Sequence, residues 1–192
     1  MVKTGTVIFD LDGTLIDAVK LHEETFVQAF RDFGFTVRGE DVRALVGITG
    51  LEIAGRLAGP ELAQKIYDRK TELFFEWFDR FDEMEGATAV LEELRRRGHR
   101  LAVATSGNKR VMEKVAERFG WKFDMVVTAE DVKHGKPDPE MLDKIKAELP
   151  GPYVFVGDTH YDKEAGDAAG IRTLILGEDI RRLADLLETE LF

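Results

Sequence analysis

The chain has 192 residues, 44% of them apolar and 33% charged, and its 27 basic and 37 acidic side chains give a net charge of −10. The apolar fraction excludes a disordered chain, no apolar run approaches the roughly 20 residues that span a bilayer, and the lack of cysteine excludes disulfides and thiolate sites. Because an acidic protein repels phosphate backbones, we expect no nucleic-acid or membrane partner. The opening residues lack the order of a secretion signal, so we expect a cytoplasmic protein.

An apolar run at Thr6 to Phe9 predicts a first buried strand, and the region that follows it differs from the rest of the chain. No convincing strand occurs between residues 17 and 85, where apolar residues recur at helical spacing. We expect a small all-helical cap inserted after the first strand, with hinges near residues 16–17 and 82–86. Its expected helices are 21–33, 41–45, 52–57 and 61–81.

From residue 86 onward, short apolar runs alternate with helical patterns. The runs are apolar on both faces, as in the buried strands of a parallel sheet. This alternation predicts an α/β fold, a Rossmann-like core of residues 1–16 and 86–192 with helices on both faces of its sheet. The expected strands are 101–104, 125–127, 153–156 and 173–176, and the expected helices are 89–97, 109–119, 139–149, 163–169 and 179–191.

Carboxylates follow two of the predicted strands. Asp10 and Asp12 come after the first strand, and Asp158 and Asp162 come after the strand at 153–156. Taken singly, each pair is equally explained by turn or helix capping. The carboxyl ends of parallel strands share one edge of the sheet, however, where two carboxylates 4 Å apart would repel by about 4 kcal/mol. Oxygen ligands without cysteine or clustered histidine favour Mg²⁺ as the counter-ion.

Groups suited to an anion follow two further segments. Thr105 and Ser106 end the strand at 101–104, where hydroxyls and backbone N–H groups precede a helix. Lys136 lies in a loop whose following helix starts at Asp138 and Pro139. Alone, these residues could be an ordinary helix cap and a solvated lysine. With the carboxylates they predict a phosphoryl site with a divalent cation.

These residues together resemble the haloacid dehalogenase superfamily, specifically its phosphatases with an inserted helical cap of the C1 type. The resemblance covers the whole chain, and residues 17–85 are similar to the cap of the phosphoglycolate phosphatase and β-phosphoglucomutase branch. The four motifs appear in family order: Asp10-Leu11-Asp12-Gly13-Thr14, Thr105, Lys136, and Gly157-Asp158 with Asp162.

The resemblance implies a mechanism. Asp10 would be the nucleophile that forms an aspartyl-phosphate, and Asp12 the acid and base that serves the leaving group and then water. Thr105, Ser106 and Lys136 would bind the phosphoryl oxygens. The Mg²⁺ ligands would be the Asp10 carboxylate, the Asp12 carbonyl and Asp158, with Asp162 as a further ligand or a support. The expected substrate is a small phosphomonoester.

Two alternatives stay open. His22 resembles the hinge histidine of β-phosphoglucomutases, which would make the protein a sugar phosphomutase. Gly50 stands where those mutases carry a phosphate-binding arginine, and Gly157 replaces a glutamate of theirs. The second alternative is a noncatalytic phosphate-binding module, which the intact motifs oppose.

The remaining candidate features are expected to play lesser parts. We expect His134 and His160 to be solvated, and residues 47–50 to form a cap turn facing the substrate rather than a nucleotide-binding loop. We expect a monomer, although the sequence leaves the oligomeric state and the natural substrate open.

Overall fold

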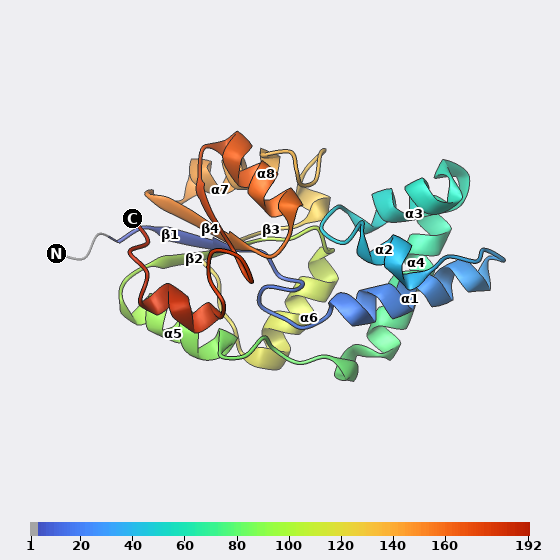
Figure 1. The fold of residues 1–192 in the computed structure, drawn as a ribbon, viewed down its shortest axis with the longest axis horizontal. Helices are drawn as coiled ribbons and strands as arrows, with labels where there is room; N and C mark the ends of the chain where they lie inside the picture. Colours follow the sequence, from blue (N-terminus) through green and yellow to red (C-terminus); the bar gives the residue numbers. More distant parts are fainter. Residues whose placement is uncertain (1–3) are drawn as a thin grey trace.

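The computed structural model describes residues 4–192, so the first three residues of the expected core segment 1–16, and most of the opening segment compared with a secretion signal, lie outside it. Within the described residues, five parallel strands form one sheet in the order β3-β2-β1-β4-β5 (Figure 1). The predicted α/β class and parallel sheet are confirmed. The strands are Thr6–Phe9 (β1), Arg100–Ala104 (β2), Met125–Val127 (β3), Tyr153–Gly157 (β4) and Arg172–Ile175 (β5).

The register of the three middle strands decides where the polar segments meet. Phe9 of β1 pairs with Val103 of β2 on one side and with Val156 of β4 on the other. The residues that follow these strands therefore leave the sheet at the same edge, as the sequence predicted.

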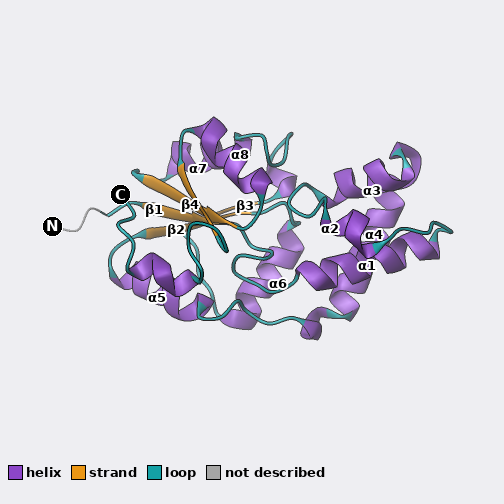
Figure 2. Cartoon of the chain, viewed as in Figure 1, coloured by secondary structure: helices purple, strands orange, loops and turns teal. Residues whose placement is uncertain are grey.

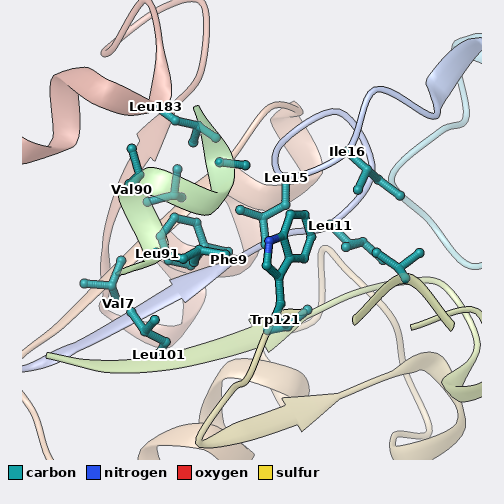
Figure 3. Close-up of a cluster of buried hydrophobic side chains, with 14 of the residues drawn as sticks. Val7, Phe9, Leu11, Leu15, Ile16, Val90, Leu91, Leu101, Trp121 and Leu183 are labelled. Atoms are coloured by element: carbon teal, nitrogen blue, oxygen red, sulfur yellow. The ribbon is translucent and has the colours of Figure 1, made fainter. Parts of the chain in front are cut away.

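Helices cover both faces of the sheet (Figure 2). Alternating residues of β1 point to opposite faces, so Val7 and Phe9 enter one apolar cluster and Ile8 enters the other. The first cluster includes residues of Ala87–Arg96 (α5), Lys109–Phe119 (α6) and Leu183–Leu187 (η3), and part of it is drawn in Figure 3. The second includes residues of Glu140–Glu148 (α7) and His160–Ala169 (α8). A short 3₁₀ segment, Ala129–Asp131 (η2), follows β3.

A helical insert follows β1, as predicted, and extends to one side of the sheet in Figure 1. The insert has an apolar cluster of its own, centred on Phe26, Phe30 and Ile66. Among the residues 4–192, none of the helices is long and apolar enough to cross a membrane. The elements of the insert are Val19–Asp32 (α1), Gly39–Arg43 (α2), Gly50–Ala58 (α3), Pro60–Glu76 (α4) and Phe78–Arg80 (η1).

The segments that enter and leave the insert run side by side. The Asp17 N–H donates to the Asp82 carbonyl at 3.0 Å, and the Met84 N–H donates to the Leu15 carbonyl at 2.8 Å. These contacts coincide with the hinges expected near residues 16–17 and 82–86. The exact domain limits, 1–16 and 86–192 against 17–85, remain a prediction.

Two expected helices end differently in the structure. The helix expected over 61–81 stops at Glu76, and Phe78 and Phe81 turn inward to join the core cluster of the sheet. The prediction of a helix over 179–191 is wrong, because only the short 3₁₀ segment Leu183–Leu187 forms there. Leu183 and Leu186 are buried. Packing of these apolar side chains thus outweighs local helix propensity.

Candidate active site

A buried lysine links two of the carboxylates at the sheet edge. The Lys136 Nζ donates to Asp10 Oδ1 at 2.5 Å and to Asp162 Oδ1 at 2.6 Å. The Lys136 side chain is only 1% exposed, and Asp162 is fully buried. Burial opposes the charged form, but the two carboxylates raise the pKa of Lys136, so the ammonium stays charged.

Asp162 is held on its other oxygen by the start of α8. Its Oδ2 accepts from the Thr159 hydroxyl at 2.6 Å and from the Thr159 N–H at 2.9 Å, while the Thr159 side chain caps the helix. Burial opposes ionisation, but Lys136 and these donors lower the pKa of Asp162. The capping alternative for this motif named Asp158 or Thr159, and Thr159 is the residue that caps α8. Asp162 completes the capping box, which places it against Lys136.

Asp158 approaches the turn after β1 closely. The Thr14 hydroxyl donates to its Oδ1 at 3.2 Å. Gly13 has a φ of 88°, and a Cβ added there would lie 2.2 Å from Asp158 Oδ2. Only glycine meets both the backbone and the space requirement at this position.

The chemistry of the donor set suits a divalent cation. One carboxylate oxygen each from Asp10, Asp158 and Asp162 lies within 4.8 Å of the others. Burial and the neighbouring carboxylates raise the pKa of Asp10, although Lys136 opposes this, and burial followed by Asp162 raises the pKa of Asp158 to about 6. A single lysine therefore does not neutralise the cluster, and these hard oxygen ligands fit a cation such as Mg²⁺.

Asp12 turns away from this cluster toward the helical insert. His22 Nε2 lies 2.7 Å from Asp12 Oδ1, and Lys70 Nζ lies 2.7 Å from His22 Nδ1. A neutral imidazole satisfies both contacts, because it accepts from Lys70 at Nδ1 and donates to Asp12 from Nε2. His22 stacks on Phe74 with ring centroids 4.7 Å apart, which fixes the orientation of the imidazole.

The pKa shifts of Asp12, His22 and Lys70 agree with a neutral imidazole at His22. Burial lowers the pKa of His22 and lowers the pKa of Lys70 to about 8. Burial opposes ionisation of Asp12, but His22 and Lys70 hold its pKa below the usual value. The lowered pKa values of both groups favour an ionised Asp12 beside a neutral His22.

The loop after β2 contacts both the site and the insert. Thr105 is buried and its hydroxyl accepts from the Gly107 N–H at 3.0 Å. The Ser106 hydroxyl donates to the Gly47 carbonyl of the insert at 2.6 Å, so in this arrangement it joins the two parts of the chain. The Asn108 side chain accepts a hydrogen bond from the Val111 N–H and so caps α6, as the helix-cap alternative for this segment predicted. Its amide nitrogen lies 3.3 Å from the Tyr67 hydroxyl.

Two cavities lie between the insert and the sheet edge. A small one of about 50 Å³ is lined by Asp10, Asp12 and Lys136 from the core and by His22 and Lys70 from the insert, among others. A larger cleft of about 1220 Å³ adjoins it, and four residues line both: Gly50, Tyr67, Asn108 and Lys136. The expected cap turn takes part, since Gly47, Ile48 and Gly50 line the small cavity.

The structure thus brings together the residues singled out from the sequence, although their roles stay predictions. Asp12 contributes no side-chain oxygen to the acidic cluster, and the metal prediction for it concerns its carbonyl. His134 and His160 are exposed, as expected. Sequence reasoning missed Lys70, although a signal existed: it falls between Ile66 and Leu73 on the apolar stripe of α4, where a lysine is unusual.

A five-stranded parallel sheet, an acidic cluster at its carboxyl edge and a helical insert after β1 define the class of protein: an α/β protein with a candidate metal site at the edge of its sheet. A family model described as haloacid dehalogenase-like hydrolase matches residues 7–176. The chain belongs to that family, which confirms the resemblance, and it is a phosphohydrolase of the family.

Individual relatives agree with this assignment. An uncharacterized protein in the fgs 3' region of Lacticaseibacillus casei is 34% identical over 90% of this chain and 84% of its own. Pyrophosphatase PpaX of Bacillus mycoides is 27% identical over 96% of this chain and 88% of its own. The crystal structure of CbbY from Rhodobacter sphaeroides with phosphate superposes with a TM-score of 0.80 at 26% identity, covering 93% of this chain and 89% of CbbY.

Proposed function

We propose that the protein is a Mg²⁺-dependent phosphatase that hydrolyses a small phosphomonoester through an aspartyl-phosphate. The observation that carries this proposal is the position of Asp10, whose carboxylate lies in the acidic cluster, bonds Lys136 and lines the same small cavity as Asp12. A nucleophile, an acid or base and a cation for the transferring group therefore surround one space.

In the first step a carboxylate oxygen of Asp10 attacks phosphorus, and the bond from phosphorus to the leaving oxygen breaks. Asp12 gives that oxygen a proton. In the second step Asp12 takes a proton from water, which attacks the aspartyl-phosphate and releases phosphate and the free Asp10 carboxylate. Lys136 remains charged throughout and balances negative charge on Asp10 and on the phosphoryl oxygens. The Thr105 hydroxyl supplies a further donor beside them, and the Ser106 hydroxyl would do so once its bond to the Gly47 carbonyl is released.

Asp12 must gain a proton before it can act as the acid. His22 and Lys70 hold its pKa low in the closed arrangement, which suits the second step. A bound phosphate dianion adds negative charge next to Asp12 and so raises its pKa, which favours protonation when substrate is present. The same residue can then serve both steps.

The cation would be held by Asp10, Asp158 and the carbonyl of Asp12, and when bound it would offset charge on the transferring phosphoryl group. Both oxygens of Asp162 already have partners, in Lys136 and Thr159. We therefore assign Asp162 to the support of Lys136 rather than to direct ligation.

Binding of a substrate beside Asp10 and Asp12 requires the insert to move, because the large cleft reaches Lys136 but is not lined by either aspartate. The small cavity has room for few water molecules and not for a phosphate ester with its leaving group. The paired segments at residues 15–17 and 82–84 are the connections about which the insert would swing. Closure would then exclude bulk water from the reaction.

The test is release of p-nitrophenol from p-nitrophenyl phosphate. We expect turnover with Mg²⁺, none after chelation with EDTA, and none for Asp10→Asn. Asp79→Asn, which alters an exposed aspartate of the insert, is the matched control and should keep wild-type turnover. Full activity of Asp10→Asn, or activity equal with and without metal, would contradict the proposal.

One observation favours a sugar phosphomutase as the second candidate, namely the contact of His22 with Asp12. Against it, the space beside Gly50 is filled by Tyr67, 2.4 Å from a Cβ added there, which leaves no room for an arginine. Interconversion of β-glucose 1-phosphate and glucose 6-phosphate without net phosphate release would establish the mutase. The relatives suggest other substrates to screen, since their names include a pyrophosphatase and a variant of CbbY was crystallised with xylulose-(1,5)bisphosphate.

A further inference from the structure

Three cations of α6 lie over the aromatic rings of the segment that leaves the insert. The cations are four residues apart, so they share one face of the helix. A cation within about 6 Å of a ring centroid is attracted to the face of the ring. The contacts, measured from the charged group to the ring centroid, are Arg110 to Phe75 at 4.3 Å, Lys114 to Phe78 at 4.5 Å and Arg118 to Phe81 at 5.0 Å. A row of cation–π contacts therefore joins α6 to the end of the insert (Figure 1).

Two of these contacts hold a part of the chain that packs into the core. The helix α4 ends at Glu76, and the rings of Phe78 and Phe81 lie beyond it, buried in the apolar cluster of the sheet. Arg118 adds a hydrogen bond, since its Nη1 donates to the Phe78 carbonyl at 2.9 Å. We therefore expect residues 78–81 to stay with the core when the insert moves.

The contact of Arg110 with Phe75 differs, because it joins the core to the insert itself. Phe75 lies in the last turn of α4, and its ring is only partly buried. Lys114 also reaches this ring, at 5.3 Å, but Arg110 lies closer. Arg110 also lines the large cleft between the insert and the sheet edge. Its contact is therefore on the side where the insert and the core would separate.

The position of Arg110 at the start of α6 connects this contact to the candidate site. The Asn108 amide, one residue before α6, lies 3.3 Å from the Tyr67 hydroxyl of α4. The start of α6 thus meets α4 at Tyr67 and at Phe75, which are about two helical turns apart. The loop before this turn carries residues 105–106, the candidate phosphate-binding hydroxyls. An insert held against Arg110 is therefore held against that loop.

We propose that Arg110 is a positioning residue that holds the insert closed over Asp10 and Asp12 through the face of Phe75. Arg110 touches no reacting atom and acts by raising the population of the closed arrangement. The inference rests on the movement of the insert in the proposed function. One cation–π contact at an exposed site changes an equilibrium by about two- to fivefold, so Arg110 favours closure and still permits opening.

The test measures closure directly by pulsed electron paramagnetic resonance. The chain has no cysteine, so Glu61→Cys on α4 and Glu164→Cys on α8 provide the two sites for spin labels, and both replace exposed side chains. The labels report the distance between the insert and the core. The protein is measured without metal or substrate, so the result does not depend on turnover. We expect two distance populations, one closed and one open.

The variants are made in this labelled protein. Arg110→Met removes the charge, and Phe75→Leu removes the ring. We expect each to raise the ratio of open to closed protein by about two- to fivefold, and Arg110→Lys, which keeps the charge, to raise it less. Because the two side chains act through one contact, the double variant should be no more open than the more open single variant. Arg181→Met is the matched control, since it removes the same charge from an exposed side chain of the core, and it should leave the ratio unchanged.

An unchanged ratio in Arg110→Met would overturn the role of Arg110, and so would a double variant whose effect equals the product of the two single effects. A single distance population in every protein would overturn it as well, together with the movement of the insert. Hydrolysis of p-nitrophenyl phosphate separates this inference from the proposed function. Turnover with an unchanged ratio removes only the role of Arg110, whereas the expected ratios without turnover in Mg²⁺ remove only the phosphatase chemistry.

Discussion

His22 Nε2 lies 2.7 Å from Asp12 Oδ1, so a side chain of the helical insert contacts the carboxylate that we propose as acid and base at the sheet edge. The contact joins the start of the insert to the turn after β1. If the insert moves to admit substrate, as we propose, its return would orient Asp12 in the same movement that excludes solvent.

The first prediction concerns this contact. Asp12→Asn should lower kcat by about 10²- to 10⁴-fold, the usual contribution of a general acid or base, and His22→Gln by a smaller factor because Asp12 remains. Both losses should be larger for an alkyl phosphate than for p-nitrophenyl phosphate, whose leaving group needs less help from an acid. Equal losses on the two substrates would show that His22 has only a structural role.

The second prediction concerns the ion pairs of Lys136. Lys136→Met should abolish turnover and lower the free energy of unfolding by about 3–5 kcal/mol, because it leaves the buried Asp10 and Asp162 without a counter-charge. Urea denaturation measures this change. Adding Asp162→Asn to Lys136→Met should recover part of the stability and none of the activity. No recovery would mean that Asp162 does not depend on Lys136 for its burial.

The third prediction gives the pH dependence of the metal-free protein. The pKa of Asp158 is raised to about 6 in the folded state, against about 3.9 in an unfolded chain. The folded state therefore binds the proton more tightly, and stability falls as the pH rises from about 4 to about 6. Asp158→Asn should remove this contribution to the fall, as thermal melts in EDTA at a series of pH values would show.

Magnesium supplies the control for that measurement. Above pH 6 the ionised Asp158 should bind the cation, so Mg²⁺ should raise the Tm of the wild-type protein more at pH 7.5 than at pH 4.5. Asp158→Asn should lose most of the increase at pH 7.5. An equal increase in both proteins would place the cation elsewhere.

The fourth prediction concerns Gly13. Gly13→Ala forces an alanine to a φ of 88° and its Cβ against Asp158, so it should lower stability by more than about 1 kcal/mol and weaken Mg²⁺-dependent turnover. Gly34→Ala is the matched control, since Gly34 has a φ of 84° and nothing lies within 4 Å of the added Cβ. It should show the backbone strain alone, with turnover retained. Equal effects of both variants on turnover would contradict a specific role for Gly13.

The sheet was predictable because its strands are buried on both faces and read as short apolar runs, such as residues 6–9 and 153–156. The convergence of Asp10 and Asp158 followed from the parallel arrangement alone. The end of the chain was not predictable in the same way. Leu183 and Leu186 have a spacing that suits an α-helix. In the structure a short 3₁₀ segment already buries both side chains against α5, so no longer helix forms there.

Within the site, the sequence indicated which residues take part better than it indicated which of them form hydrogen bonds with one another. It placed Lys136 among carboxylates but could not tell that Asp162, rather than Asp158, bonds its ammonium. Lys70 was missed because it lies 48 residues from His22 and 58 from Asp12 along the chain, and their meeting depends on how the insert folds over the core.

The paired segments at Asp17 and Asp82 have a consequence for how such proteins diversify. The chain leaves the core and returns to it at adjacent points, so the strands of the core are connected there as they would be by a short turn. A different module could be grafted at this junction without altering the path of any strand. Reaction chemistry and substrate choice are thereby encoded in separable stretches of sequence, and each can change while the other is retained.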